Sequence, residues 1–204
     1  MEYIVAKGSG TVIGNVLRQI ALTQLEAVSV IAYAVGDNST VISPGNNSIL
    51  EDMIEFGNNL TSYVYEIDAE WKKVSVTFSD ILTIQHLENE GVSVKNPNSL
   101  SGELLHVLDG TVTVTVYFRK SHNVSYVEDN KYFLESKGVD LSHISVINSR
   151  YKRINNFTYS VSPHDDKTEI LDIRVSGILN EVEDEILIKV MSTLDDILDV
   201  IRGV

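Results

Sequence analysis

Apolar residues repeat at helical spacing near the N-terminal end of the chain, between Gly8 and Leu25. The repeat consists of Val12, Ile13, Val16, Leu17, Ile20 and Ala21. It predicts an amphipathic helix with one buried face, which follows a tight glycine turn and is capped by Thr11. Gly14 and Asn15 are both unfavourable in a helix interior. They indicate either a close approach by a neighbouring element or a helix that is itself an interface.

A second helical pattern lies at the C-terminal end. Asn180 and Glu183 have the spacing of a capping box, and the acidic residues around them favour the positive end of a helix dipole. The apolar stripe that follows has coiled-coil-like spacing: Ile186, Leu187, Val190, Met191, Leu194, Ile197, Leu198 and Ile201. Such a stripe is wide enough for two neighbours. The helix therefore either closes the core of its own chain or forms the seam of a bundle.

The pattern between these helices is mostly that of strands. Ala27–Val35 is rich in β-branched and aromatic residues, and Thr111–Phe118 alternates threonine with valine, which is typical of a strand with one buried face. A helix is predicted from Ser48 to Phe56, with Ser48 and Glu51 as its capping box and with Gly57 and Asn58 ending it. Shorter strands are predicted at 3–6, 63–67, 73–78, 92–94, 140–151, 156–161 and 169–175, and a loop at 119–130.

Composition narrows the class of protein. The chain has 204 residues, of which 43% are hydrophobic, so it is long and apolar enough to fold around a core. It has no cysteine, which excludes disulfides and thiolate metal sites. Its formal net charge is −13, and so negative a surface repels phosphate. We therefore expect protein partners rather than direct contact with DNA. No apolar run approaches the roughly 20 residues that span a bilayer.

Neither catalytic nor metal-binding residues are predicted. The five histidines are scattered without the spacing of metal ligands: His86, His106, His122, His143 and His164. The acidic pairs at 165–166 and 195–196 fall in a turn and on the polar face of the last helix, where solvation is the simplest explanation. We expect no cofactor.

The string Thr11–Leu22, TVIGNVLRQIAL, resembles the first helix of the RNA polymerase alpha subunit of bacteria and plastids, whose pattern is T-x-G-N-x-L-R-R before an apolar run. In that family the second arginine helps to engage the beta subunit. The resemblance therefore implies a large-subunit contact at Arg18 and Gln19, where Gln19 departs from the family pattern.

Weaker matches to the same family follow in the family's order along most of the chain. They lie at 48–60, 94–97, 104–108, 111–118, 140–161 and 171–201. Two departures stand out. The segment 120–123 replaces a G-R-G-Y loop, and the chain stops at Val204, where the family continues through a linker into a C-terminal domain that binds DNA and activators. Upstream promoter contacts are therefore not expected.

The resemblance implies an α+β fold like the N-terminal domain of alpha. A discontinuous dimerisation subdomain, 1–35 and 145–204, would carry an inserted β-rich subdomain, 36–144. The implied dimer interface contains Gly14, Asn15, Leu17, Ile20, Ile186, Val190, Met191, Leu194, Ile197, Leu198 and Ile201. The implied partners are an identical or paralogous alpha-like chain and the beta and beta-prime subunits. The chain would be their non-catalytic scaffold in transcription, in the cytoplasm at the nucleoid or in a plastid stroma.

Two other interpretations stay open at this point. Gly8, Gly10 and Gly14 followed by Asp37 imitate a dinucleotide-binding unit of an oxidoreductase, in which glycines admit a pyrophosphate and the acid binds a ribose. Against this, the segment 62–175 offers many strands and almost no helix, whereas a doubly wound sheet alternates them. The other interpretation is an unrelated acidic adaptor that dimerises.

Overall fold

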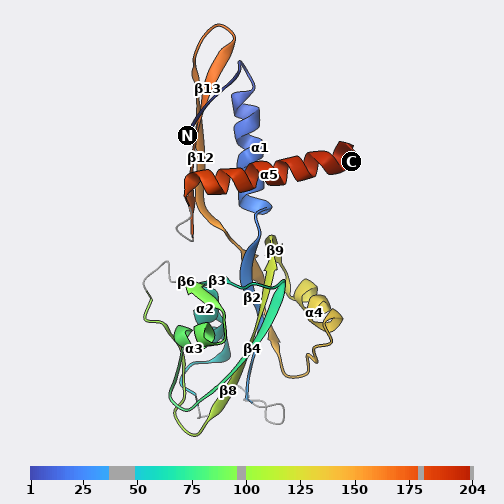
Figure 1. Cartoon of the computed structure of the whole chain (residues 1–204). Helices are drawn as coiled ribbons and strands as arrows, with labels where there is room; N and C mark the ends of the chain where they lie inside the picture. The colour runs from blue at the N-terminus through green and yellow to red at the C-terminus, as the bar shows by residue number, and fades with distance from the viewer. Residues whose placement is uncertain (37–48, 96–99, 179–181, 203–204) are drawn as a thin grey trace. The chain divides into compact units, whose positions relative to one another are not determined.

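The computed structural model describes residues 1–36, 49–95, 100–178 and 182–202, and it confirms an α+β fold. The chain divides into two compact units (Figure 1). The first unit contains Met1–Glu26 and Lys152–Val204, and the second contains Ala27–Tyr151. This division differs from the expected boundaries at 35 and 145, because the strand Ala27–Val35 pairs with strands of the second unit.

The first unit is a three-stranded antiparallel sheet with two helices. Its strand order is β1–β13–β12, with β1 at Glu2–Ala6, β13 at Thr168–Gly177 and β12 at Ile154–Pro163. Helices α1 (Gly10–Thr23) and α5 (Glu183–Arg202) pack on this sheet. Their shared core contains Leu17, Ile20, Phe157, Leu171, Ile173, Ile186, Leu187 and Val190.

The second unit is organised around a larger sheet in the order β4–β8–β2–β3–β6, with β10 also paired to β2. The strands are β2 (Ala27–Val35), β3 (Val64–Glu66), β4 (Trp71–Phe78), β6 (Ser93–Lys95), β8 (Val112–Ser121) and β10 (Ser145–Val146). The predicted alternation in β8 is confirmed, since Val112, Val114 and Val116 all lie in one core. Tyr117 belongs to a second core with Phe133 and Tyr151.

Helices cover these cores. Helix α2 (Met53–Thr61) and the short helix α3 (Ile84–Asn89) contribute Phe56, Leu60 and Leu87 to the valine core. Helix α4 (Val127–Ser136) contributes Phe133 and Leu134 to the other. Two strand pairs complete the unit: β5 (Ile81–Thr83) with β7 (Glu103–His106), and β9 (Asn123–Ser125) with β11 (Ser149–Tyr151).

Several local predictions were wrong. The predicted loop at 119–130 instead contains the end of β8, strand β9 and the start of α4. The strand predicted over 140–151 is only the two short strands β10 and β11. The short helix α3 was not predicted. These errors share a cause, because the segments are short or polar and tertiary pairing decides their conformation.

The helix starts also differ from prediction. Thr11 lies inside α1, whose N-cap is Ser9 without a side-chain hydrogen bond. The N-cap of helix α2 is Asp52, whose carboxylate accepts the Glu55 backbone N–H at 2.7 Å, and the helix continues through 57–58 to Thr61. Glu51 instead binds β7. Ser48 and Asn180 lie outside the described residues. In the part of the chain that the structure describes, no helix is long and apolar enough to cross a membrane.

Candidate subunit interface

Gly14 lets α1 pack closely on β12. A Cβ atom added there would lie 2.5 Å from Cδ2 of the Tyr159 ring, which is closer than carbon atoms approach. The Tyr159 hydroxyl donates a hydrogen bond to Oδ1 of Asn15 at 2.8 Å. Both unusual residues of the helix are therefore explained by packing within the chain, which is the close-approach alternative.

The other side of α1 is apolar and uncovered. Val12 is 63% exposed, and Ile13, Val16 and Leu22 are also exposed, whereas Gly14, Leu17 and Ala21 are buried. At about 100° per residue, Val12 and Val16 lie on the opposite side of the helix from Gly14. Of the six residues predicted to share one buried face, Leu17, Ile20 and Ala21 are buried, and the prediction was wrong for Val12, Ile13 and Val16. The apolar stripe spans more than half of the helix, and one sheet covers only part of it.

The second half of α5 is also uncovered. Ile186, Leu187 and Val190 are buried in its first half, and Leu194 packs against the same core. Beyond Leu194, Ile197, Val200 and Ile201 are exposed, the last at 76%. In Figure 1, α5 crosses α1 and continues beyond it. A 20-residue helix is about 30 Å long, so its C-terminal half has more length than this core can cover.

Acidic residues flank the apolar stripe of α5. Glu183, Asp184 and Glu185 occupy the first turn, where the helix dipole favours negative charge. Near the other end, Arg202 pairs with Asp199 at 3.5 Å, and both side chains are exposed. An apolar strip with a charged border is typical of a helix that packs against another protein surface.

The residues predicted for the dimer interface fall into two groups. Gly14, Leu17, Ile20, Ile186 and Val190 are buried in the core of the first unit. The residues of the second group are exposed or half-buried: Asn15, Met191, Leu194, Ile197, Leu198 and Ile201. Arg18 and Gln19 are exposed on α1. Sequence reasoning did not single out the outward side of Val12, Ile13 and Val16, although the width of the stripe was a signal for it.

The structure contradicts the dinucleotide-binding interpretation. A carboxylate oxygen of Glu169 accepts the Gly10 backbone N–H at 2.5 Å. The chain's own negative charge therefore occupies the helix end where a phosphate would bind. All strand pairs among the described residues are antiparallel, which differs from a doubly wound sheet. Asp37 lies outside the described residues.

Two histidines of the second unit, His86 and His106, have structural partners. Nδ1 of His106 lies 2.5 Å from Oε1 of Glu51, and this hydrogen bond raises the pKa of His106 above its usual value. Nδ1 of His86 lies 3.0 Å from the Thr83 hydroxyl at the start of α3. Across the described ranges of the chain, no group of three or more His, Cys, Asp or Glu side chains is placed to hold a metal ion.

The chain was compared with known protein families and with individual proteins. No family model matches it. It is similar to proteins named DNA-directed RNA polymerase subunit alpha from Borreliella burgdorferi and Borreliella afzelii, each 25% identical over 176 residues. The protein of that name from Borrelia garinii subsp. bavariensis is 26% identical over the same length. Each match covers 78% of this chain and 48% of the relative, so the chain spans about half the length of the curated relatives it matches. These similarities support the interpretation of the chain as an alpha-like RNA polymerase subunit.

Proposed function

We propose that this chain is a divergent alpha-type subunit of a multisubunit DNA-directed RNA polymerase and acts in transcription as a non-catalytic assembly scaffold. The observation that carries the proposal is the similarity to three polymerase alpha subunits over 78% of the chain. The uncovered apolar surface of α1 and α5 supports it, because monomeric proteins rarely expose apolar patches of this kind.

The scaffold would be a dimer joined by that surface. Val12, Ile13 and Val16 of α1 and Ile197 and Ile201 of α5 would form its apolar centre. A two-fold interface must be complementary to itself, and two helices that cross can each pack on the same pair in a second copy. The partner is either an identical chain or a paralogous alpha-like chain.

The beta and beta-prime subunits would assemble on this dimer. Arg18 and Gln19 lie exposed on α1, so both side chains are free of the core and available to a large subunit. The net charge of −13 argues against direct contact with DNA, so the chain would act through proteins. Its place would be the cytoplasm at the nucleoid, or the stroma if a plastid encodes it.

A pull-down of the tagged chain from its native source, with mass spectrometry of the bound proteins, tests this function. We expect two partners, the beta and beta-prime subunits, in stoichiometric amounts. Recovery of the chain alone as a stable dimer would contradict the polymerase role and favour an acidic dimeric adaptor. A Val12→Ser, Ile13→Ser double variant that fails to dimerise should also lose both large subunits, whereas Ile188→Ser, on the side of α5 opposite its apolar stripe, should keep them.

A further inference from the structure

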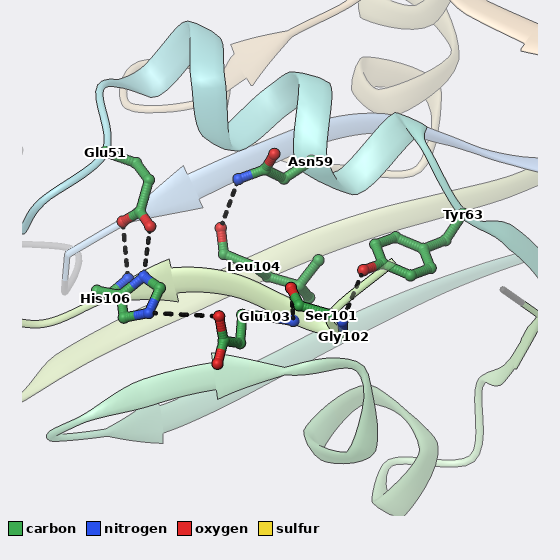
Figure 2. Close-up of polar contacts among 8 residues, drawn as sticks. All are labelled: Glu51, Asn59, Tyr63, Ser101, Gly102, Glu103, Leu104 and His106. Carbon is green, nitrogen blue, oxygen red and sulfur yellow. Dashed lines mark hydrogen bonds and ion pairs between the residues drawn. The ribbon is translucent and has the colours of Figure 1, made fainter. Parts of the chain in front are cut away.

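The segment before α2 is fixed against β7 in the second unit. The Leu50 backbone N–H donates to the His106 carbonyl at 3.0 Å, and Ile49 forms an isolated antiparallel bridge with Val107. The Glu51 carboxylate accepts the backbone N–H of His106 at 2.7 Å and also binds its ring through Nδ1 (Figure 2). This junction is therefore held by both main-chain and side-chain contacts.

Side chains of α2 and of the residues after it occupy the rest of the same edge of β7. Asn59 donates to the Leu104 carbonyl at 3.1 Å, and the Gly102 N–H donates to the Tyr63 hydroxyl at 3.1 Å (Figure 2). Together with the contacts at His106, they satisfy main-chain groups at every second residue of the strand. Another strand therefore cannot pair with this edge of β7. A partner could bind this corner, which we call the platform, only through its outward-facing side chains.

Large apolar side chains lie on the outside of this platform. Leu50 is 63% exposed, Leu108 is 60% exposed, and Ile54 in the first turn of α2 is 75% exposed. Ile49 and Val107 point into the core, so alternation along each strand segment directs Leu50 and Leu108 to the outer face. Diagonal neighbours of this kind are close enough for one apolar partner to cover both.

The same corner is strongly acidic. The two segments that form it, 49–63 and 100–110, contain five aspartates and glutamates and neither lysine nor arginine. Asp80 and Glu103 both face the His106 ring, with Oε2 of Glu103 at 3.8 Å from Nε2. Asp52 and Asp109 are exposed beside the leucines. Among the residues that the structure describes, none of these four carboxylates lies within ion-pair distance of a lysine or arginine.

We propose that this acidic leucine corner, defined by Leu50, Ile54 and Leu108 with Asp52, Glu103 and Asp109, binds a basic amphipathic segment of another protein. Leucines bordered by carboxylates that have no lysine or arginine partner among the described residues are complementary to a segment with one apolar face and lysine or arginine at its margins. A second copy of this chain is not the occupant, because it would bring the same negative charge to the contact. This surface is separate from the α1 and α5 surface proposed for the dimer.

An NMR titration of the full chain tests the proposal with a designed 18-residue helical peptide that carries leucines on one face and lysines on the other. A peptide of the same composition in scrambled order, without an apolar face, is the control ligand. We expect shifts centred on Leu50, His106 and Leu108, and affinity that falls as salt rises from about 0.05 to about 0.5 M. The scrambled peptide should bind about tenfold more weakly, because it leaves the leucines uncovered.

Two protein variants identify the surface. Leu50→Ser with Leu108→Ser should weaken binding of the designed peptide about tenfold, and Leu22→Ser on α1 should leave it unchanged. Asp52→Asn with Asp109→Asn should weaken peptide binding several-fold, and it keeps a good N-cap residue on α2. This variant tests the surface even if the serine variant is misfolded. Equal affinity for both peptides, unchanged binding in the leucine and aspartate variants, or shifts centred on another surface would each contradict the proposal.

Discussion

The contact between Gly14 and Tyr159 shows how one residue sets the distance between α1 and β12. Alanine at position 14 would place its Cβ 2.5 to 2.7 Å from three carbons of the Tyr159 ring. Overpacking of this kind costs about 1–3 kcal/mol, and the higher helix propensity of alanine returns about 1 kcal/mol. We therefore expect Gly14→Ala to lower the free energy of unfolding by up to about 2 kcal/mol in urea denaturation at fixed protein concentration.

The control for this experiment is Gly14→Ala in a protein in which a smaller side chain replaces Tyr159. In a Tyr159→Leu protein the ring is gone, so Gly14→Ala should be neutral or stabilising. A Gly14→Ala protein that is more stable than the parent with Tyr159 intact would contradict the packing explanation.

His106 and Glu51 give stability a pH dependence. The Glu51 hydrogen bond raises the pKa of His106 in the folded chain, and the carboxylates of Glu103 and Asp80 act in the same direction. A raised folded pKa means that the protonated ring stabilises the fold. This contribution is complete below the unfolded pKa of about 6.5 and is lost as pH rises through the raised folded pKa.

Urea denaturation between about pH 6 and about pH 9 measures this contribution. Glu51→Gln should flatten the part of the pH dependence that His106 causes, and NMR should show a lower pKa for His106. Glu103→Gln is the matched control and should have the smaller effect, because its carboxylate is 3.8 Å from Nε2 rather than 2.5 Å from Nδ1. Equal slopes in the parent and the Glu51→Gln protein would refute the assignment.

At the scale of elements, we expect substitutions on the two sides of α5 to have different effects on the proposed dimer. Ile201 lies on the stripe that continues from the buried residues of the first unit, and Ile188 lies on the opposite side of the helix and is exposed. Ile201→Asp should weaken the proposed dimer about 100-fold or more, because it removes apolar contact and places a charge in the seam.

Sedimentation velocity over a range of concentrations measures this change. Ile188→Asp is the same substitution on the other side and should leave the dimer intact. A parent chain that is monomeric, or a dimer that survives Ile201→Asp, would contradict the proposed interface. Leu194 is a poorer choice for this test, because it also packs against the core of its own chain.

Strictly periodic elements could be predicted from the sequence, and elements with a mixed buried face could not. Helix α1 and strand β8 have apolar residues at every position that the core requires. Helix α4 buries Phe133 and Leu134 together with Asn130, whose amide binds the Ile147 carbonyl and the Ser149 hydroxyl. A polar residue in the buried face breaks the hydrophobic period. The remaining signal was the carboxylate of Asp129, three residues after Tyr126, which accepts the Tyr126 N–H.

The candidate interface could be predicted only in part, for a related reason. The apolar stripes of α1 and α5 are visible in the sequence, but the sequence does not say which side of each stripe the chain covers itself. That depends on β12 and β13, which follow α1 by about 150 residues in the sequence. Their side chains Phe157, Tyr159 and Leu171 cover one side of α1. The exposed side, with Val12 and Ile201, is what this sheet leaves uncovered.

At the scale of the whole molecule, the two units have separate cores, and only the first carries the proposed dimer surface. Dimerisation therefore stabilises the first unit by mass action and leaves local opening of the second unit unaffected. Hydrogen exchange should show amides of α1, β12 and β13 becoming better protected as protein concentration rises. Amides of β2 and β8 should exchange at a constant rate.

The Ile201→Asp protein is the control for this experiment, because it should show no concentration dependence in either unit. If protection of β2 and β8 rose with concentration as much as that of β12, self-association would involve the second unit as well. The acidic leucine corner could then not be the separate surface that its negative charge indicates.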